Sequence, residues 1–150
     1  MSAPFPQQSQ TLGYLLRTTY QLLQLEIYGL LRDAGHPDVR EAHSSVLRHL
    51  PPNGTRMADL AKCAGISKQS IAYLVDDLCR LGYLEMHEHL TDRRAKLVCL
   101  SERGRSLLEL LKRLSDQAEV RCAQVVGQRA MSQVRETLAA LISAKSSSER

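Results

Sequence analysis

An apolar stripe with the period of an α-helix runs through the first part of the chain. Its members are Leu12, Leu15, Leu16, Thr19, Leu22, Leu23, Ile27, Leu30 and Leu31. This spacing predicts one long amphipathic helix, which Gly35 and Pro37 would end. The stripe is long for a small domain, so we expect it to contact a partner helix beyond its own core.

The pattern then predicts two shorter helices separated by a sharp break. The first spans about 39–50, with four apolar residues facing inward: Val39, Val46, Leu47 and Leu50. The sequence Pro-Pro-Asn-Gly at 51–54 breaks the chain. Thr55 is then placed as the N-cap of a short helix that carries Met57, Leu60 and Ala61.

A tight turn and a helix with one polar face come next. Gly65 lies at the turn, and Ser67 is the expected N-cap of a helix that Gly82 closes. The buried stripe of this helix is Ile71, Leu74, Val75 and Leu78. Its exposed side is Lys68, Gln69, Ala72, Tyr73 and Asp76. The arrangement is typical of a helix-turn-helix, although an ordinary helical hairpin accounts for this segment equally well.

A basic hairpin follows and decides between these two interpretations. Residues 84–88 and 96–100 are predicted to form two short strands around a polar turn at 89–95. Between positions 91 and 105 two acidic residues, Asp92 and Glu102, face five basic ones: Arg93, Arg94, Lys96, Arg103 and Arg105. Directly after a polar-faced helix, such a hairpin is a wing, where positive charge would meet phosphate or the narrow minor groove.

Two long helices complete a mainly α fold: a winged helix-turn-helix with a two-stranded β wing and long terminal helices that form a dimerisation region. Ser101 caps the first of these helices, and a break near Gly127 separates it from the last. Their apolar stripes are Leu107, Leu111, Leu114, Ala118, Cys122 and Val125, then Val134, Leu138, Leu141 and Ile142. We expect a flexible arm at 1–10, dimerisation helices at 11–36 and 106–145, a DNA-binding region at 37–105 and a tail at 146–150.

Composition and charge add modest constraints. The chain is 43% hydrophobic but only 4% aromatic, with no Trp, so its core must be aliphatic. A net charge of +4 and a pI of about 9.0 are compatible with a polyanionic partner.

No segment approaches the roughly 20 apolar residues that span a bilayer. Residues 1–10 lack the features of a signal peptide, so we expect a cytoplasmic protein.

The motifs of common enzyme classes are missing. There is no Gly-rich phosphate loop, no G-x-S-x-G elbow and no His-Glu metal motif. Asp76 and Asp77 are neighbouring carboxylates, but they are predicted to lie on a helix surface. We therefore expect no catalysis and no cofactor. An interaction module that binds no DNA is the alternative from another class.

Cysteine and histidine residues suggest two further alternatives. Cys63, Cys79, Cys99 and Cys122 are widely spread and form no C-x-x-C pair, which favours small buried residues over a redox sensor. His87 and His89 lie two apart on a predicted strand and so point to the same side, as zinc ligands would. With no further ligand nearby, solvated strand residues are the preferred interpretation.

Several motifs between about positions 55 and 105 carry a family resemblance. They are Asp59–Ala61, Gly65–Ser67, Leu74–Leu78, Gly82–Glu85 and, most specifically, Asp92–Val98 followed by Leu100–Gly104. In these the chain resembles the MarR family of regulators, whose wing carries Asp-x-Arg and then a Ser/Thr-Glu-x-Gly cap. The resemblance implies a homodimer with two winged heads, an Asp92 that braces the wing and an Arg94 that reaches the minor groove.

The chain also departs from the family pattern in the wing. Met86 and His87 stand where basic residues are common, and the usual Pro near the wing tip is missing. We therefore expect a phosphate grip that is weaker or partly dependent on His protonation.

Candidate site residues follow from these patterns and from the resemblance. The expected DNA contacts are Thr55, Ser67, Lys68, Gln69, Ser70, Tyr73, Arg93 and Arg94. The family often binds small aromatic or anionic ligands between its first two helices and its fifth, where Tyr14, Tyr20, Tyr28 and His43 would lie. Packing or rim positions are the alternative for each of these four. Peroxide-sensing members of the family carry a reactive cysteine in the first helix, and this chain has none there, so a small-molecule effector or no effector is preferred over thiol oxidation. The function expected is operator binding, usually repression, by a homodimer on a pseudo-palindromic site.

Overall fold

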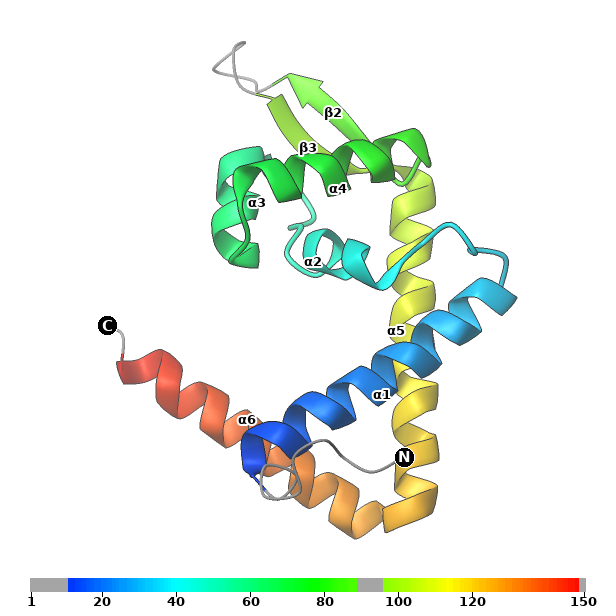
Figure 1. The fold of residues 1–150 in the computed structure, drawn as a ribbon, viewed down its shortest axis with the longest axis vertical. Coiled ribbons are helices and arrows are strands. Elements are labelled where there is room, and N and C mark those ends of the chain that lie inside the picture. The colour runs from blue at the N-terminus through cyan, green and yellow to red at the C-terminus, as the bar shows by residue number, and fades with distance from the viewer. Residues whose placement is uncertain (1–10, 89–95, 149–150) are drawn as a thin grey trace. The chain divides into compact units, whose positions relative to one another are not determined.

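The computed structural model describes residues 11–88 and 96–148, with side chains up to residue 146 (Figure 1). Its elements are α1 (Leu12–Asp33), the 3-10 helix η2 (Glu41–His43), α2 (Ser44–Leu47), β1 (Thr55–Arg56), α3 (Met57–Ala64), α4 (Lys68–Arg80), β2 (Leu84–Glu88), β3 (Lys96–Leu100), α5 (Glu102–Val126) and α6 (Gln128–Ser148). They divide into two compact units, residues 1–114 and residues 115–150. The fold is mainly helical with one small antiparallel sheet, as the sequence predicts.

The long first helix forms as predicted, but only part of its stripe is covered. Thr11 caps α1 by accepting a hydrogen bond from the Tyr14 amide at 3.2 Å. The helix ends at Asp33, and Gly35 follows in the left-handed region at φ 96°. Of the stripe residues, Ile27 and Leu31 near the end of the helix are buried, while Leu12, Leu15, Leu16 and Leu22 nearer its start are exposed. Leu25, outside the predicted stripe, is also exposed.

The second helix is shorter than the predicted span 39–50. Its apolar residues are all buried, as expected, but helical structure is confined to η2 and α2. The reason at the start is local, because the amide of Arg40 donates to Nδ1 of His43 at 3.0 Å while Arg40 itself is extended. At the other end, Pro51 disfavours helical backbone at Leu50.

Thr55 belongs to a strand, so its predicted role as an N-cap is wrong. Thr55 pairs with Val98 and Arg56 with Leu97, which adds β1 to the wing and gives a three-stranded sheet in the order β1-β3-β2. This close pairing depends on Gly54, which has φ +78°. A Cβ at that position would lie 2.8 Å from the carbonyl oxygen of Val98 and would overlap Sγ of Cys99. The sheet therefore exceeds the predicted two-stranded hairpin by one short edge strand.

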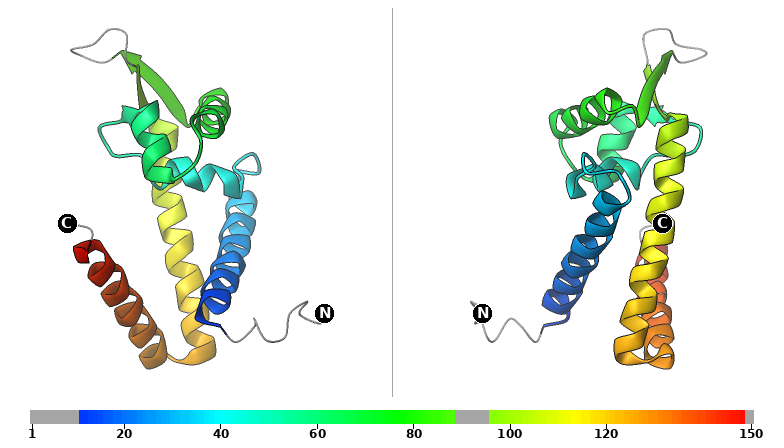
Figure 2. Two further views of the ribbon diagram at one scale, coloured as in Figure 1. Left: turned by 60° about the vertical axis from the view of Figure 1, so that its left-hand side comes forward. Right: turned by 90° about the vertical axis from the view of Figure 1, so that its right-hand side faces the viewer.

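The helix-turn-helix forms as predicted. Gly65 closes α3 with φ 67°, and Ser67 caps α4 by accepting a hydrogen bond from the Ser70 amide at 3.0 Å. The predicted stripe of α4 is buried: Ile71, Leu74, Val75 and Leu78. α4 packs against β2, and α3 against β1 and β3, so these elements stay together in both views of Figure 2. A buried apolar core thus holds α4 with its polar side outward.

α5 begins directly against the end of α4. Ser101 Oγ accepts from the Gly104 amide at 3.0 Å, as the predicted cap, and donates to the Gly82 carbonyl at 2.6 Å. A Cβ on Gly104 would overlap the carbonyl oxygen of Tyr83, whose side chain is fully buried. Only glycine permits this contact between the first turn of α5 and the chain entering β2.

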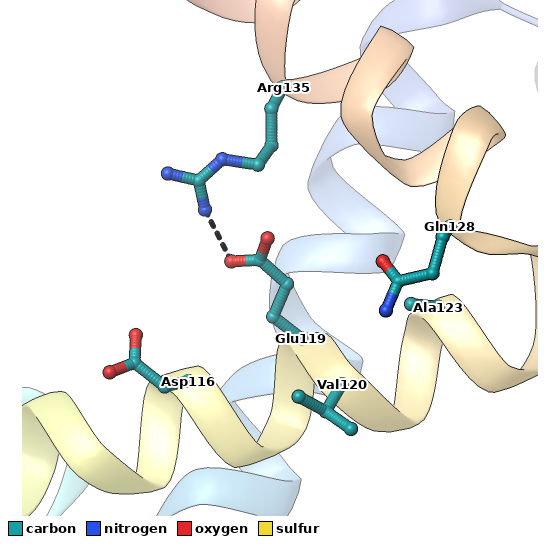
Figure 3. Close-up of a pocket in the computed structure, with 6 residues that line it drawn as sticks. All are labelled: Asp116, Glu119, Val120, Ala123, Gln128 and Arg135. Atoms are coloured by element: carbon teal, nitrogen blue, oxygen red, sulfur yellow. Dashed lines mark hydrogen bonds and ion pairs between the residues drawn. The ribbon is translucent and has the colours of Figure 1, made fainter.

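The second unit holds the later part of α5 and α6. Gly127, at φ 90°, separates the two helices where a break was predicted. A cavity of about 260 Å³ between them is lined by Asp116, Glu119, Val120, Ala123, Gln128 and Arg135, and Arg135 forms an ion pair with Glu119 (Figure 3). Val125, Val126, Leu141 and Ile142 are exposed. None of the helices in the described ranges is both long and apolar enough to cross a membrane.

Candidate nucleic-acid interface

The first turns of α4 present a continuous polar surface. Lys68, Gln69 and Ser70 are exposed, and Tyr73, one turn further on, is 60% exposed. Ser67 and Ser70 are linked by a hydrogen bond between their hydroxyls at 2.8 Å, so these two side chains support the start of the helix. Free amides and the positive end of the helix dipole add to the attraction for phosphate at this end. The arrangement suits the insertion of α4 into a polyanionic groove.

The other expected DNA contacts are distributed differently. Thr55 is half-buried within β1 and paired with Val98, away from any helix cap. Arg93 and Arg94, and the bracing residue Asp92, lie outside the described residues, so their roles stay predictions.

Two of the five basic residues counted with the wing lie at the start of α5, where they are exposed and also hydrogen bond to neighbouring parts of the head. The guanidinium of Arg103 lies over the Tyr83 ring at 4.5 Å and donates to its hydroxyl at 2.9 Å. Arg105 donates to the carbonyl oxygen of Leu100 at 3.0 Å. These two arginines therefore belong to the first turn of α5 and not to the β hairpin itself.

Tyr83 is the centre of a polar cluster that the sequence did not reveal. Its hydroxyl donates to Asp38 at 3.2 Å and lies 2.7 Å from Nδ1 of His36. Arg103 also lies 3.7 Å from the Asp38 carboxylate. Burial raises the pKa of the Tyr83 phenol, and the Arg103 hydrogen bond acts against that shift. The cluster joins the loop after α1 to the start of β2 and the first turn of α5.

A second cluster of polar side chains contacts the last turn of α4. The Asp77 carboxylate accepts from His43 Nε2 at 2.9 Å and from Arg40 at 2.5 Å, and it forms an ion pair with Arg80. The hydrogen bonds from His43 and then Arg40 lower the pKa of Asp77. Its side chain is only 12% exposed, so the prediction of a surface carboxylate is wrong for Asp77. No local signal indicates the contacts of Asp77 with His43 and Arg40, because these residues lie 34 and 37 positions away from it.

His43 is expected from the sequence to line an effector cleft, and the structure does not support that expectation. Its side chain has no exposed surface, and both ring nitrogens have protein partners. Burial lowers its pKa, partly opposed by the Asp77 hydrogen bond. Burial and partners make His43 a neutral packing residue of the head.

The three tyrosines expected in the effector cleft lie on α1 and, unlike His43, keep some exposed surface. The Tyr20 hydroxyl accepts from Arg48 at 2.5 Å, and the Arg48 guanidinium lies 5.5 Å from the Tyr20 ring centre. Burial raises the pKa of Tyr28. Tyr14 is half-buried. Arg48 is thus a cation beside one of the expected cleft residues, Tyr20, which the sequence pattern did not indicate.

The cysteines are less buried than expected: Cys63 is exposed and the other three are half-buried, so the expectation of buried residues is wrong for Cys63. Burial raises the pKa of the Cys79 and Cys99 thiols, the opposite of the shift that activates a thiolate. No group of three potential metal ligands occurs among the described residues. His87 lies 3.1 Å from Glu85, and His89 falls outside those residues.

Comparisons with known proteins agree with this architecture. Residues 38–95 match the model of the MarR family. CouR from Rhodococcus jostii RHA1, solved bound to p-coumaroyl-CoA, is 27% identical, with 89% of this chain and 92% of that chain covered and a TM-score of 0.67. A MarR-family transcriptional regulator from Rhodococcus sp. RHA1 is also 27% identical, with 89% and 96% covered and a TM-score of 0.68.

A further structure extends the likeness in fold. The transcriptional repressor CouR bound to a 23-mer DNA duplex is 23% identical, with 95% and 99% covered and a TM-score of 0.72. None of the curated proteins compared with the chain matches it.

Proposed function

We propose, from the premise that this chain is a member of the MarR family of transcriptional regulators, that it binds operator DNA as a homodimer and represses transcription. The observation that carries the proposal is the exposed polar start of α4, held by a cap at Ser67 and a fully buried stripe behind it. A helix fixed in this way can enter a major groove without losing its own packing.

Direct readout falls to the first turn of α4. Gln69 suits adenine, whose major-groove edge offers a donor and an acceptor, and Lys68 suits guanine or phosphate. Tyr73 lies one turn further along the same exposed side. Arg94 would add a minor-groove contact and Asp92 would brace the wing, as the resemblance implies. The repressor CouR, solved on a DNA duplex, supports this mode of action.

The homodimer is supported by apolar surface that each unit leaves exposed by itself. In the first unit this surface lies on α1: Leu12, Leu15, Leu16, Leu22 and Leu25. In the second it lies on the end of α5 and on α6: Val125, Val126, Val134, Leu141 and Ile142. An isolated chain would expose these residues to water, which favours their burial against a second copy. We expect an interface of more than about 2,000 Å².

A small-molecule effector would bind beside Tyr20 and Tyr28. Arg48 places a positive charge next to the Tyr20 ring, a combination that suits an aromatic or anionic ligand. CouR, solved with p-coumaroyl-CoA, supports control by a ligand of this kind. A thiol sensor is less supported, because the Cys79 and Cys99 thiols are shifted away from the reactive form.

The test is DNA binding by the whole chain. Fluorescence anisotropy with duplexes from the DNA flanking the gene, and with a shuffled duplex, gives both affinity and its salt dependence. We expect one flanking duplex to bind more tightly than the shuffled one, and Gln69→Ala to relax the preference at one or two base pairs. Equal binding to all duplexes at every salt concentration would contradict the proposal.

A further inference from the structure

Two neighbouring carboxylates of α4 lie in opposite environments. Asp76 is exposed on the polar side of the helix. The Asp77 side chain is 12% exposed and contacts His43, Arg40 and Arg80. Both residues carry the same charge at the same distance from the start of the helix, to within one residue. A general electrostatic effect on DNA would therefore treat them alike, whereas their contacts differ completely.

The contact with His43 fixes the last turn of α4 to η2, which precedes α2. Nδ1 of His43 accepts from the Arg40 backbone amide at 3.0 Å, so that nitrogen carries no proton. The neutral ring then holds its proton on Nε2 and donates it to Asp77 at 2.9 Å. His43 has no exposed surface, and its ring orientation is determined at both ends. The result is a directed hydrogen bond from a buried group to the recognition helix.

The contact with Arg40 adds a second link between the last turn of α4 and the segment before α2. The Arg40 guanidinium donates to Asp77 at 2.5 Å, and Arg40 directly precedes η2. Arg80, the third partner of Asp77, belongs to α4 itself, so its ion pair joins two residues of one helix. His43 and Arg40 thus both hold α4 to another part of the chain through Asp77.

We propose that Asp77 is a positioning residue for DNA recognition: through His43 and Arg40 it fixes the orientation of α4, so that sequence preference depends on a carboxylate that does not touch DNA. This inference rests on the proposed DNA-binding function. It adds to that function because the residues predicted to read DNA from the sequence did not include Arg40, His43 or Asp77.

The closing experiment compares Asp77→Asn with Asp76→Asn in the full chain. Each variant removes one negative charge from the same helix, so each should bind a shuffled duplex slightly more tightly. For the preferred duplex, selected by the wild type from a random pool of double-stranded DNA, the two should separate. We expect Asp76→Asn to keep the wild-type ratio of preferred to shuffled affinity, and Asp77→Asn to lower that ratio by about tenfold.

A second pair keeps the test decisive if Asp77→Asn melts at a much lower temperature. Arg40→Gln and Arg80→Gln each remove one cation that contacts Asp77, and both side chains are more than half exposed, at 52% and 74%. Only Arg40 comes from outside α4, since Arg80 pairs with Asp77 within the same helix. We expect Arg40→Gln to select a different set of duplexes from the pool, and Arg80→Gln to select the wild-type set with uniformly lower affinity.

The outcomes distinguish this inference from the proposed function. If the wild type selects no duplex from the pool, the DNA-binding proposal itself fails. If the wild type selects a site and Asp77→Asn keeps the same affinity ratio as Asp76→Asn, the positioning role is overturned. That role is also overturned if Arg40→Gln, folded and dimeric, selects the wild-type set.

Discussion

The winged head and the long terminal helices solve the burial of apolar residues in different ways. In the head, Leu60, Ile71, Leu78 and Val98 have no exposed surface within a single chain. On α1 and α6, by contrast, Leu25 and Ile142 are each 68% exposed. A head whose core is buried within one chain can present a rigid surface, whereas the exposed apolar residues of α1 and α6 would be covered in the proposed homodimer. Stability of the head and stability of the assembly should therefore respond to different mutations.

The largest expected effect is a loss in the stability of the head. Leu78→Ala removes a fully buried side chain and leaves a cavity, so we expect the free energy of unfolding to fall by about 2–5 kcal/mol. Chemical denaturation at several protein concentrations measures it, and the loss should be the same at each concentration. Leu25→Ala is the matched control, since its effect should appear mainly through the concentration dependence of unfolding. Equal, concentration-independent losses for both variants would contradict the comparison.

A smaller effect is expected on the dissociation constant of the proposed dimer. Ile142→Glu places a charge on the exposed apolar surface of α6, and we expect the dimer dissociation constant to rise by about thirtyfold or more. Sedimentation over a range of concentrations measures the constant. Met86→Glu, at a residue of the wing that is 40% exposed, should leave it unchanged. A dimer that is indifferent to Ile142→Glu would show that α6 does not contribute to the interface.

Within the head, polar contacts matter less than apolar burial. Tyr83→Phe removes a hydroxyl that Asp38, His36 and Arg103 all contact, so we expect a loss of about 1–2 kcal/mol in unfolding free energy. Tyr73→Phe makes the same chemical change at an exposed site and should leave stability unaltered. Thermal melting of the two variants side by side gives the answer, and equal melting temperatures would show that the cluster adds nothing.

The smallest effect is a dependence of stability on pH. Burial lowers the pKa of His43 below its ordinary value of 6.5, so the unfolded chain takes up a proton at a higher pH than the folded chain does. Stability is therefore fully present above about pH 6.5 and falls as the pH drops through the folded-state pKa. The groups that face His43 are Asp77, Arg40 and Asp38.

His43→Gln is the variant that isolates this effect, because glutamine does not titrate. Between about pH 7.5 and pH 5, the melting temperature should fall less steeply for His43→Gln than for the wild type. This range includes the ordinary pKa of histidine, about 6.5. Parallel curves for the two proteins would assign the acid sensitivity to other groups.

Local signals decided what the sequence could predict. The cap at Ser67, the break at Gly65 and the buried stripe of α4 are properties of adjacent residues, so the helix-turn-helix was predicted with its polar side outward. The strand at Thr55 was missed because two residues become a strand only by pairing with Val98 and Leu97, more than 40 positions away.

The candidate site residues show the same difference between local signals and contacts over long sequence distances. Gln69 and Lys68 follow from their places on one helix, and the structure leaves both exposed. Arg103 was counted as wing charge, yet it stacks on Tyr83. The link from His43 to Asp77 joins segments whose own patterns say nothing about each other. A basic residue and a histidine have several possible partners, and only the packing of the folded chain selects among them.

The glycine at the start of α5 has a mechanical consequence. Because Gly104 has no side chain, the first turn of α5 lies directly on the backbone of Tyr83, and Ser101 ties the same turn to Gly82 at the end of α4. There is no soft layer of side chains at this joint to absorb a small rotation. Any tilt of the first turn of α5 must therefore displace the end of α4 by a comparable amount. A rotation of the first turn of α5 is therefore transmitted to the end of α4 through direct backbone contact.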